Sequence, residues 1–453
     1  MKEIRLENFR CYTNQIIRFR TGINLLIGDN ASGKTSMLKA CKYVLSAFFS
    51  GFSDENTRWI NPDINDFSIQ INDGVIAPEL PVKIHFVCDS RQYESLSYNG
   101  ECYNPGEGQE YYTLQKNSKK NSRALITGIT RYRDYANLLQ ETYTRIDDNQ
   151  ITRIFALPLF ACFSTEDIHA TRKIDANKFL EYAQKASFGY YECLDGNGFF
   201  PYWEKRLLIL HEGQKNLQEI EIVRNSISKA LGREGCNIIA DMQVRSIQGR
   251  IYYIFTDGRE VEADLLSDGY KRLVNIVTDI AFRCALLNRE IYGLNSPERT
   301  SGTVLIDEVD LHLHPTLQAT VLKGLRNAFP KIQFIITTHA PMVMTGVESN
   351  SENVVYKLDY SETHGYTIME TETFGMDVSM ITNAILGQIP RDKEVDRELD
   401  ILFNDIDEEN YADARIRLSE MKEKFGDNLP ELSKAEAILG FMNEDENEED
   451  NKE

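Results

Sequence analysis

The chain has 453 residues and a formal net charge of −20, with 42% hydrophobic and 26% charged residues. This composition excludes a disordered, collagenous or low-complexity chain, because the apolar content suffices for a hydrophobic core. No apolar run approaches the ~18 residues of a membrane span, the first residues show no apolar signal core, and the 8 Cys residues form no C-x-x-C pair. We therefore expect a cytoplasmic protein with no membrane partner.

The negative charge is concentrated toward the C-terminus. Residues 391–453 carry 9 Lys or Arg and 22 Asp or Glu, a net charge of −13, which leaves −7 for residues 1–390. A mildly acidic body is not typical of a general nucleic-acid binder, although it is compatible with a local basic groove.

The expected elements alternate between strands and helices, which favours an α/β fold. Residues 4–9 and 15–19 alternate apolar and polar side chains, whereas residues 23–27 are almost continuously apolar, as in a buried central strand. A helix is expected at 33–49, and a basic stretch at 116–123 is expected to be a solvent-exposed loop. The further expected elements are strands at 81–88, 111–115 and 155–163, helices at 131–151 and 203–231, a hairpin within 236–263, a helix at 273–287, and apolar strands at 303–306 and 333–337 that flank a helix at 317–329.

Residues 28–35 read Gly-Asp-Asn-Ala-Ser-Gly-Lys-Thr, which fits the phosphate-loop pattern G-x-x-x-x-G-K-[ST] without a mismatch. An apolar strand precedes the loop and a helix follows it, as the motif requires. The glycines let successive backbone N–H groups converge on a phosphate, and the helix N-terminus adds a favourable dipole. We expect ATP to be bound by Asn30, Ala31, Ser32, Gly33, Lys34, Thr35 and Ser36, with the Thr35 hydroxyl as a ligand of Mg²⁺.

Two further apolar runs end in residues suited to nucleotide chemistry. Residues 304–306 lead to Asp307 and Glu308. Because ligands bind at the carboxyl edge of a parallel sheet, Asp307 is expected to ligate Mg²⁺ and Glu308 to activate the attacking water as general base. Residues 334–338 lead to His339, which we expect to contact the γ-phosphate.

His312 and His314 do not predict a metal site. Residues at i and i+2 of a strand face opposite sides, and no further ligand cluster is evident in the sequence. We expect these histidines in a loop that leads into a helix and packs or contacts a partner protomer.

Residues 266–272, Leu-Ser-Asp-Gly-Tyr-Lys-Arg, precede an expected helix that Ser267 can cap. Together with the other motifs, they resemble the signature of an ABC-type ATPase head of the structural-maintenance-of-chromosomes (SMC) branch. In that family, the signature Ser and Gly of a second head cover the γ-phosphate, so the resemblance implies this role for Ser267 and Gly269. The usual L-S-G-G-Q is replaced by L-S-D-G-Y, which departs from transporters and is similar to the compact ATPases of the OLD and PtuA groups.

The same groups share two other phrases with this chain. Residues 307–315 resemble their D-E-x-x-x-H-L-H-P, and residues 8–10 resemble their N-F-R, which implies that Arg10 approaches the nucleotide. The resemblance covers residues 1–50 and 260–345, and it leaves Gln70 and Gln150 as two candidates for the glutamine loop. Residues 374–378 and the later helices resemble PtuA-type proteins, the ATPase subunits of Septu antiphage systems.

We therefore expect an ABC/SMC-type P-loop ATPase head at residues 1–390, with an inserted region at about 51–250, followed by a helical C-terminal extension at 391–442. Residues 443–453 are expected to be an acidic, disordered tail. Apolar stripes in the extension are expected to serve a partner-docking or assembly surface, the alternative being that they pack on the head. The two stripes are Leu399, Leu402, Phe403 and Ile406, and Ala412, Ile416, Leu418 and Met421.

The resemblance implies an ATPase that requires ATP and Mg²⁺, forms a homodimer or higher homo-oligomer around ATP, and controls a separate HNH-type nuclease in antiphage or retron-linked defence. Phage DNA or retron RNA or DNA is then a further ligand of the complex. Asp405 and Asp407 lie in helical sequence and do not form the D-x-D of a Toprim domain. We therefore expect no nuclease activity from the chain itself.

Two alternatives remain open from the sequence. The first is a DNA-repair or chromosome-type ATPase that clamps DNA directly, which the absence of a sustained heptad run between the phosphate loop and the signature disfavours. The second is an OLD-like nuclease with a degenerate Toprim domain. A transporter subunit is disfavoured by the divergent signature.

Overall fold

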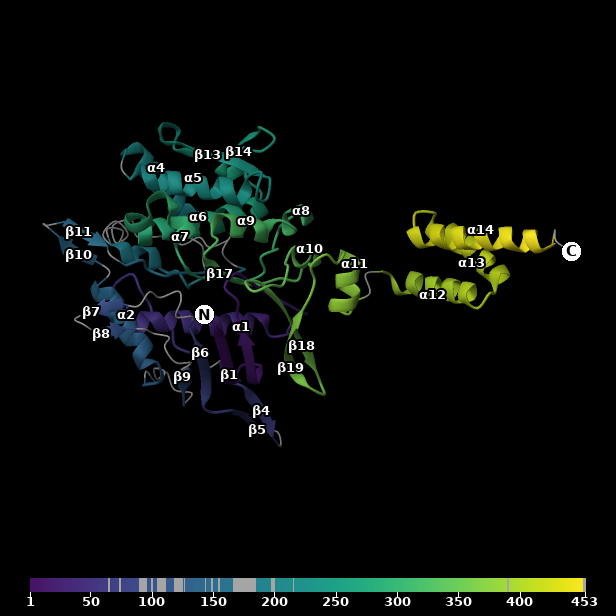
Figure 1. The fold of residues 1–453 in the computed structure, drawn as a ribbon, viewed down its shortest axis with the longest axis horizontal. Coiled ribbons are helices and arrows are strands. Elements are labelled where there is room, and N and C mark those ends of the chain that lie inside the picture. The colour runs from purple at the N-terminus through teal and green to yellow at the C-terminus, as the bar shows by residue number, and fades with distance from the viewer. Residues whose placement is uncertain are drawn as a thin grey trace. The chain divides into compact units, whose positions relative to one another are not determined.

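The computed structural model describes residues 1–63, 66–72, 75–88, 96–98, 101–103, 111–117, 125, 127–142, 144–147, 150–153, 155–165, 185–196, 200–214, 216–388 and 391–450. The chain divides into two compact units, Met1–Ile381 and Thr382–Glu453 (Figure 1). The expected limit of the ATPase head, residue 390, lies nine residues beyond the end of the first unit. None of the helices that the structure describes has the length and apolar character needed to cross a bilayer.

A six-stranded sheet forms the centre of the first unit, with the order β12-β16-β17-β3-β18-β19. The neighbouring strands are parallel except β18 and β19, which form an antiparallel pair. Every residue of β3, β16 and β17 is buried, as the continuous apolar runs predicted for central strands. The strands are β3 (Ile23–Ile27), β12 (Leu159–Phe163), β16 (Gly302–Ile306), β17 (Ile332–Thr337), β18 (Val354–Ser361) and β19 (Gly365–Thr371).

Helices cover both faces of this sheet (Figure 1). Helix α1 (Lys34–Ala47) follows β3 directly and lies on one side, whereas α5 (Leu217–Leu231), α6 (Asp268–Tyr292) and α9 (Val321–Ala328) lie on the other. Most of the 25 residues of α6 are buried, so the helix that follows the signature is a core element of the unit. This arrangement confirms the expected α/β architecture.

A second, antiparallel sheet lies beyond α1 and has the order β2-β1-β6-β9. Its strands are β1 (Glu3–Phe9), β2 (Tyr12–Arg18), β6 (Val82–Val87) and β9 (Tyr112–Lys116).

The predicted exposure of the basic stretch at 116–123 is wrong at its first residue, because Lys116 is 4% exposed and donates a hydrogen bond to the carbonyl of Pro62. Residues 118–123 of that stretch lie outside the described residues.

Two expected helices are shorter than the sequence predicted. The first ends as α2 (Thr130–Thr142) and is followed by the hairpin of β10 (Thr144–Asp147) and β11 (Gln150–Arg153), where β-branched residues favour strands. The second is broken into α4 (Phe200–Glu212) and α5, because Gln214 and Asn216 adopt left-handed backbone angles, φ 49° and 47°, that end a helix.

Short strands complete the first unit. The expected hairpin within residues 236–263 is confirmed as a three-stranded sheet of β13 (Ile239–Arg245), β14 (Arg250–Phe255) and β15 (Glu260–Glu262). The remaining pairs and short helices are β4 (Ile69–Asn72) with β5 (Val75–Pro78), β7 (Leu96–Tyr98) with β8 (Glu101–Tyr103), and α7 (Ser296–Arg299), α8 (Pro315–Gln318), α10 (Pro341–Met344) and α11 (Val378–Met380).

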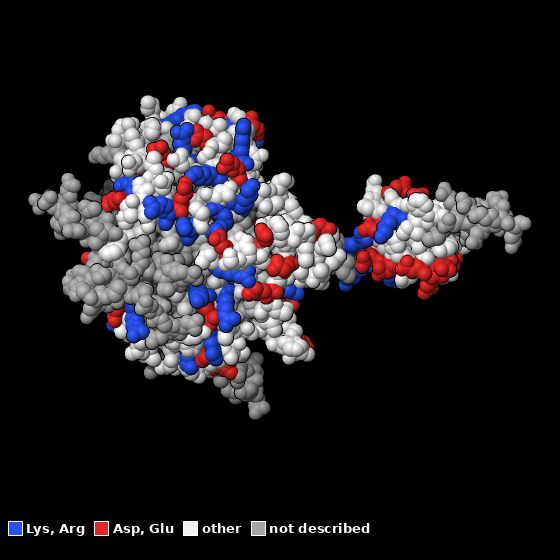
Figure 2. Space-filling view, in the orientation of Figure 1, with Lys and Arg blue, Asp and Glu red and all other residues white. Residues whose placement is uncertain are grey.

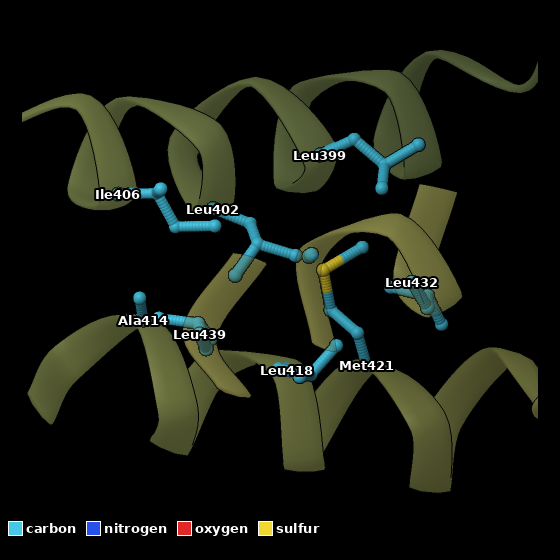
Figure 3. Close-up of a cluster of buried hydrophobic side chains, with 9 residues drawn as sticks. Leu399, Leu402, Ile406, Ala414, Leu418, Met421, Leu432 and Leu439 are labelled. Carbon is cyan, nitrogen blue, oxygen red and sulfur yellow. The ribbon is translucent and has the colours of Figure 1, made fainter. Parts of the chain in front are cut away.

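Within its described residues, the second unit includes the helices α12 (Lys393–Asp407), α13 (Tyr411–Phe425) and α14 (Pro430–Asp450), which enclose a core of their own. Figure 3 shows side chains of α12 and α13 facing each other, with those of α14 between them. The buried residues of this core are Leu399, Leu402, Ile406, Ala414, Leu418, Met421, Leu432, Ala435 and Leu439.

This core buries most of the first apolar stripe and half of the second against residues of α14. The expected docking surface stays a prediction for the side chains that remain exposed, such as Ala412 and Ile416. On α13 the buried face is Ala414, Leu418 and Met421, whereas Ile416 is 59% exposed. Helix α14 continues to Asp450, into the segment expected to be a disordered tail. Figure 2 shows Asp and Glu side chains along the side of this unit where α12 lies.

Candidate functional site

A cleft of about 280 Å³ lies at the carboxyl ends of β3, β16 and β17. Segments that follow these three strands meet there, as expected for an α/β sheet whose ligands bind at its carboxyl edge. The residues that line the cleft are Cys11, Asn30, Ala31, Ser32, Gly33, Lys34, Thr35, Ser36, Asp307, Glu308, His339 and Tyr366. The structure therefore brings together all seven predicted phosphate-loop residues, both carboxylates and the histidine.

The glycines of the phosphate loop are required by close contacts as well as by backbone conformation. Gly28 and Gly33 have φ angles of 142° and 99°, which side chains rarely adopt. A Cβ atom on Gly28 would lie 2.1 Å from the carbonyl oxygen of Leu358, and one on Gly33 would lie 2.3 Å from the hydroxyl of Tyr12. The loop is thus packed between the β1–β2 turn and β18, and neither position tolerates a larger residue.

Lys34 is folded back onto its own loop. Its Nζ donates hydrogen bonds to the carbonyl oxygens of Gly28 (2.9 Å) and Asp29 (2.7 Å) and to the hydroxyl of Ser32 (3.3 Å). Burial lowers the pKa of Lys34 to about 8, although nearby carboxylates, including Asp29 and Asp307, oppose the shift. A phosphate group placed beside this ammonium would offset the desolvation that lowers its pKa.

Thr35 and Asp307 offer two oxygen ligands to a divalent cation. The Thr35 hydroxyl lies 3.5 Å from Oδ2 of Asp307. Adjacent ligands of an octahedral Mg²⁺ are separated by roughly 3 Å, since each Mg–O distance is about 2.1 Å. The pair therefore fits Mg²⁺ in both chemistry and spacing, with the remaining positions available to phosphate and water.

Two threonines at the end of β17 hold the acidic segment that follows β16. The Thr337 hydroxyl donates to Oδ1 of Asp307 (2.6 Å) and accepts from the backbone N–H of Glu308 (2.8 Å). The Thr338 hydroxyl donates to Asp310 (2.5 Å). Neither threonine was predicted as a site residue, although hydroxyls directly before His339 on a strand beside the acidic strand were a usable signal.

Arg272, the last residue of the signature phrase, also holds this segment. Its guanidinium donates to the carbonyl oxygens of Asp307 (2.7 Å) and Glu308, and the residue is 1% exposed. Glu308 has a φ angle of 48°, a left-handed conformation that is strained for a residue with a side chain. Arg272, on the helix that follows the signature, therefore holds the backbone of Glu308, the proposed general base.

The signature residues Ser267 and Gly269 do not line the cleft of their own chain. Ser267 is exposed and occupies the expected N-cap position of α6, but its hydroxyl makes no capping hydrogen bond. Gly269 is buried, and a Cβ atom there would lie 2.3 Å from the carbonyl oxygen of His312.

His314 caps α8 by accepting from the N–H of Thr316, which confirms the expected loop that leads into a helix.

Arg10 lies beside the cleft without lining it. Its Nη1 donates to the Ser36 hydroxyl at 3.4 Å, and its Nε lies 3.4 Å from the carboxylate of Asp66. The two glutamine-loop candidates, Gln70 and Gln150, have side chains that lie outside the part of the structure that is described.

Cys11 and Tyr366 line the cleft but were not predicted from the sequence. Cys11 directly follows the N-F-R phrase, and burial raises the pKa of its thiol. The Tyr366 ring packs edge-on against Tyr12 with centroids 5.9 Å apart. Nothing in the sequence around Tyr366 indicates this position, because it depends on where β19 lies in the central sheet.

This chain is similar to a protein family and to several known proteins. Residues 3–264 match a protein family described as an AAA domain. The Retron Vc95 probable ATPase of Vibrio cholerae serotype O1 biovar El Tor is 26% identical over 420 residues, which cover 79% of this chain and 74% of the relative. Septu protein PtuA of Bacillus thuringiensis is 20% identical over 419 residues, which cover 88% and 90%. A crystal structure of the SmcHead bound to the C-winged helix domain of ScpA superposes with a TM-score of 0.46 and 13% identity, over 82% of this chain and 98% of that one.

Proposed function

We propose, since this chain belongs to the AAA-domain family and is an SMC-like ATPase close to the retron ATPases and PtuA, that it is the ATP-binding and ATP-hydrolysing subunit of a bacterial antiphage defence system. One observation carries the proposal: Lys34, Thr35, Asp307, Glu308 and His339 line a single cleft. These residues supply a phosphate cation, two cation ligands, a carboxylate base and a polar contact, which are the parts that phosphoryl transfer to water requires.

Phosphate binding is assigned to the loop and to Lys34. The loop's backbone N–H groups and the N-terminus of α1 favour an anion, and the Lys34 ammonium provides a full positive charge. The carbonyl oxygens that now accept from Lys34 are those of the loop itself. A short movement of the side chain would therefore bring its Nζ to the β- and γ-phosphates.

Thr35 and Asp307 would hold Mg²⁺, which when bound neutralises charge on the phosphate oxygens. Glu308 is proposed to accept a proton from the attacking water as general base, and His339 to contact the γ-phosphate. Thr337 and Arg272 would hold Asp307 and Glu308 in place during this step. Preorganised groups of this kind lower the barrier because they need no rearrangement as charge develops.

A second copy of the chain is proposed to complete the site. Ser267 is exposed, and neither it nor Gly269 lines the cleft of its own chain, which supports a role on a partner protomer. ATP would then be bound between the phosphate loop of one protomer and the signature of the other. The dimer or a higher homo-oligomer would control a separate HNH-type nuclease and, through the complex, contact phage or retron nucleic acid.

The proposal is tested by nucleotide binding and turnover in the full chain. Lys34→Ala removes the phosphate cation and is expected to abolish ATP binding in calorimetry, whereas Lys323→Ala, at an exposed position on α9, is expected to bind ATP normally. Glu308→Gln keeps the side-chain shape and removes the base, so it is expected to retain ATP, accumulate as a dimer and lose hydrolysis. Equal ATP affinity in Lys34→Ala and wild type, or normal hydrolysis by Glu308→Gln, would contradict the assignment. Metal-dependent DNA cutting by the purified chain would instead support an OLD-like nuclease.

A further inference from the structure

Asp66 is a fully buried carboxylate close to the phosphate loop, in a segment that carried no functional motif. Its Oδ2 accepts hydrogen bonds from the hydroxyl of Tyr43 on α1 (2.5 Å) and from the backbone N–H of Asp63 (2.7 Å). These two bonds fix the orientation of the carboxylate, so that its other oxygen faces away from them.

That second oxygen, Oδ1, faces two cations. Lys39 Nζ lies 2.8 Å from it and Arg10 Nε lies 3.4 Å from it. The far side of the same guanidinium, Nη1 of Arg10, donates to the hydroxyl of Ser36 at 3.4 Å. Arg10 thus spans two anchors, a buried carboxylate on one side and a residue that lines the cleft on the other.

We infer that Asp66 is a positioning residue for nucleotide binding: it holds the Arg10 guanidinium against Ser36 at the edge of the cleft. The inference rests on the proposed binding of ATP in that cleft. A planar guanidinium presents donors in a fixed fork, so pairing Nε with Asp66 determines where Nη1 points. Without this pair, a long side chain that is 29% exposed would sample many rotamers, few of them directed at the cleft.

The carboxylate is not needed to hold the backbone of the turn. The backbone N–H of Arg10 donates to the carbonyl of Asp66 (3.0 Å), and the N–H of Ser68 donates to the carbonyl of Asn8 (3.0 Å). These bonds join the β1–β2 turn to residues 66–68 without any side chain. Besides the bonds that Oδ2 accepts from Tyr43 and Asp63, the Asp66 side chain pairs with two cations, and one of these, Arg10, also contacts a residue of the cleft.

The opposite effect, in which Asp66 weakens ATP binding by neutralising Arg10, is the competing expectation. Removing the carboxylate would leave two unpaired cations and strengthen the local positive potential. Because the guanidinium is partly exposed, water and salt screen that added attraction. We therefore expect the loss of orientation to outweigh the gain in charge.

Asp66→Asn is the decisive variant. The asparagine carbonyl can take the place of Oδ2 and keep the bonds from Tyr43 and Asp63, while its NH₂ group meets the two cations. We expect Mg·ATP to bind the full-length variant about tenfold more weakly in calorimetry, the equivalent of ~1.4 kcal/mol. Arg10→Ala should lose a similar factor, and the double variant should lose no more than Arg10→Ala alone, because both changes remove the same interaction.

Lys39→Gln is the matched control, since it removes the other cation and leaves the Arg10 pair intact. ATP affinity is expected to be unchanged in this variant. Wild-type or tighter ATP binding by Asp66→Asn, or losses that multiply to about a hundredfold in the double variant, would overturn the inference.

Arg10→Lys provides a test that does not depend on the folding of Asp66→Asn. A single ammonium can contact Asp66 or Ser36 but cannot span both, so this variant should lose most of the affinity that Arg10→Ala loses. Wild-type affinity in Arg10→Lys would overturn the inference. Normal ATP binding by Lys34→Ala would contradict the proposed function. If Lys34→Ala lost ATP binding while the Asp66 and Arg10 variants kept wild-type affinity, the proposed function would stand and the inference about Asp66 would fail.

Discussion

The hydroxyl of Thr337 donates a 2.6 Å hydrogen bond to Oδ1 of Asp307, so the last residue of β17 orients the carboxylate that follows β16. The same hydroxyl accepts from the backbone N–H of Glu308, at 2.8 Å. One side chain on the neighbouring strand thus positions both the proposed cation ligand and the backbone of the proposed base. Thr337 itself is fully buried, whereas Asp307 and Glu308 are partly buried at the cleft.

Thr337→Val is expected to destabilise the protein and to slow ATP hydrolysis. Valine has nearly the same shape, but it leaves the partly buried N–H of Glu308 and a carboxylate oxygen of Asp307 without their partner, which costs about 1 kcal/mol, the lower end of the range for buried groups. We expect a drop of this size in the free energy of unfolding, measured by urea titration, and a turnover at least about tenfold lower. Thr337→Ser keeps the hydroxyl and serves as the control. Unchanged turnover in Thr337→Val would show that Asp307 and Glu308 need no help from β17.

ATP affinity is expected to fall as the pH rises above about 8, because burial lowers the pKa of Lys34 to about 8. In the unfolded chain, the pKa of a lysine is about 10.4. Between these values the unfolded state binds more protons than the folded state, so the contribution of Lys34 to stability rises with pH. ATP binding has the opposite sign, since a bound phosphate favours the charged ammonium and must restore its proton.

This sign can be measured as proton uptake. Calorimetry in buffers with different ionisation enthalpies should show that Lys34 takes up a proton when ATP binds at about pH 9. At about pH 7 the uptake by Lys34 should be almost zero, because the side chain is already charged. Lys34→Arg keeps its charge over the whole range and should abolish the uptake. A flat affinity profile in the wild-type protein would mean that Lys34 stays charged and does not carry the effect.

Shared sites between protomers predict a complementation experiment. Lys34→Ala removes the phosphate loop's cation, and Ser267→Arg blocks the signature, so each variant alone should fail to dimerise with ATP. A mixed dimer would contain one intact site, made from the loop of the Ser267→Arg protomer and the signature of the Lys34→Ala protomer. Light scattering and turnover of the mixture should therefore show partial recovery. ATP-driven dimerisation of either variant alone, at the wild-type level, would argue against the shared site.

The core of the second unit makes a separate stability prediction. Leu402 is fully buried among the three helices, whereas Ile416 on the neighbouring helix is 59% exposed. Leu402→Ala should lower the free energy of unfolding of the isolated fragment 382–453 by about 2–5 kcal/mol, whereas Ile416→Ala should change it by less than about 0.5 kcal/mol. Circular dichroism of the fragment during thermal unfolding would measure both. An unfolded wild-type fragment would show that this core does not fold alone.

The local parts of this protein were determined by its sequence. The phosphate loop, the buried strands at 23–27 and 303–306, and the polar residues that follow them are contiguous patterns, and the rule that ligands bind at the carboxyl edge of a parallel sheet placed them in one site. The seven loop residues, Asp307, Glu308 and His339 all line the cleft as expected.

Only the tertiary structure decided which groups hold that site together. Thr337 reaches Asp307, Arg272 reaches the backbone of Glu308, and Tyr366 reaches the cleft from β19. Thr337 and Arg272 do lie beside predicted site residues in the sequence, but no local pattern states which distant group each of them contacts. The same holds for the C-terminal stripes, whose burial depended on a third helix. Hydrophobic periodicity reports how one element meets its surroundings, whereas a contact between distant residues depends on strand order and helix packing, which no local pattern contains.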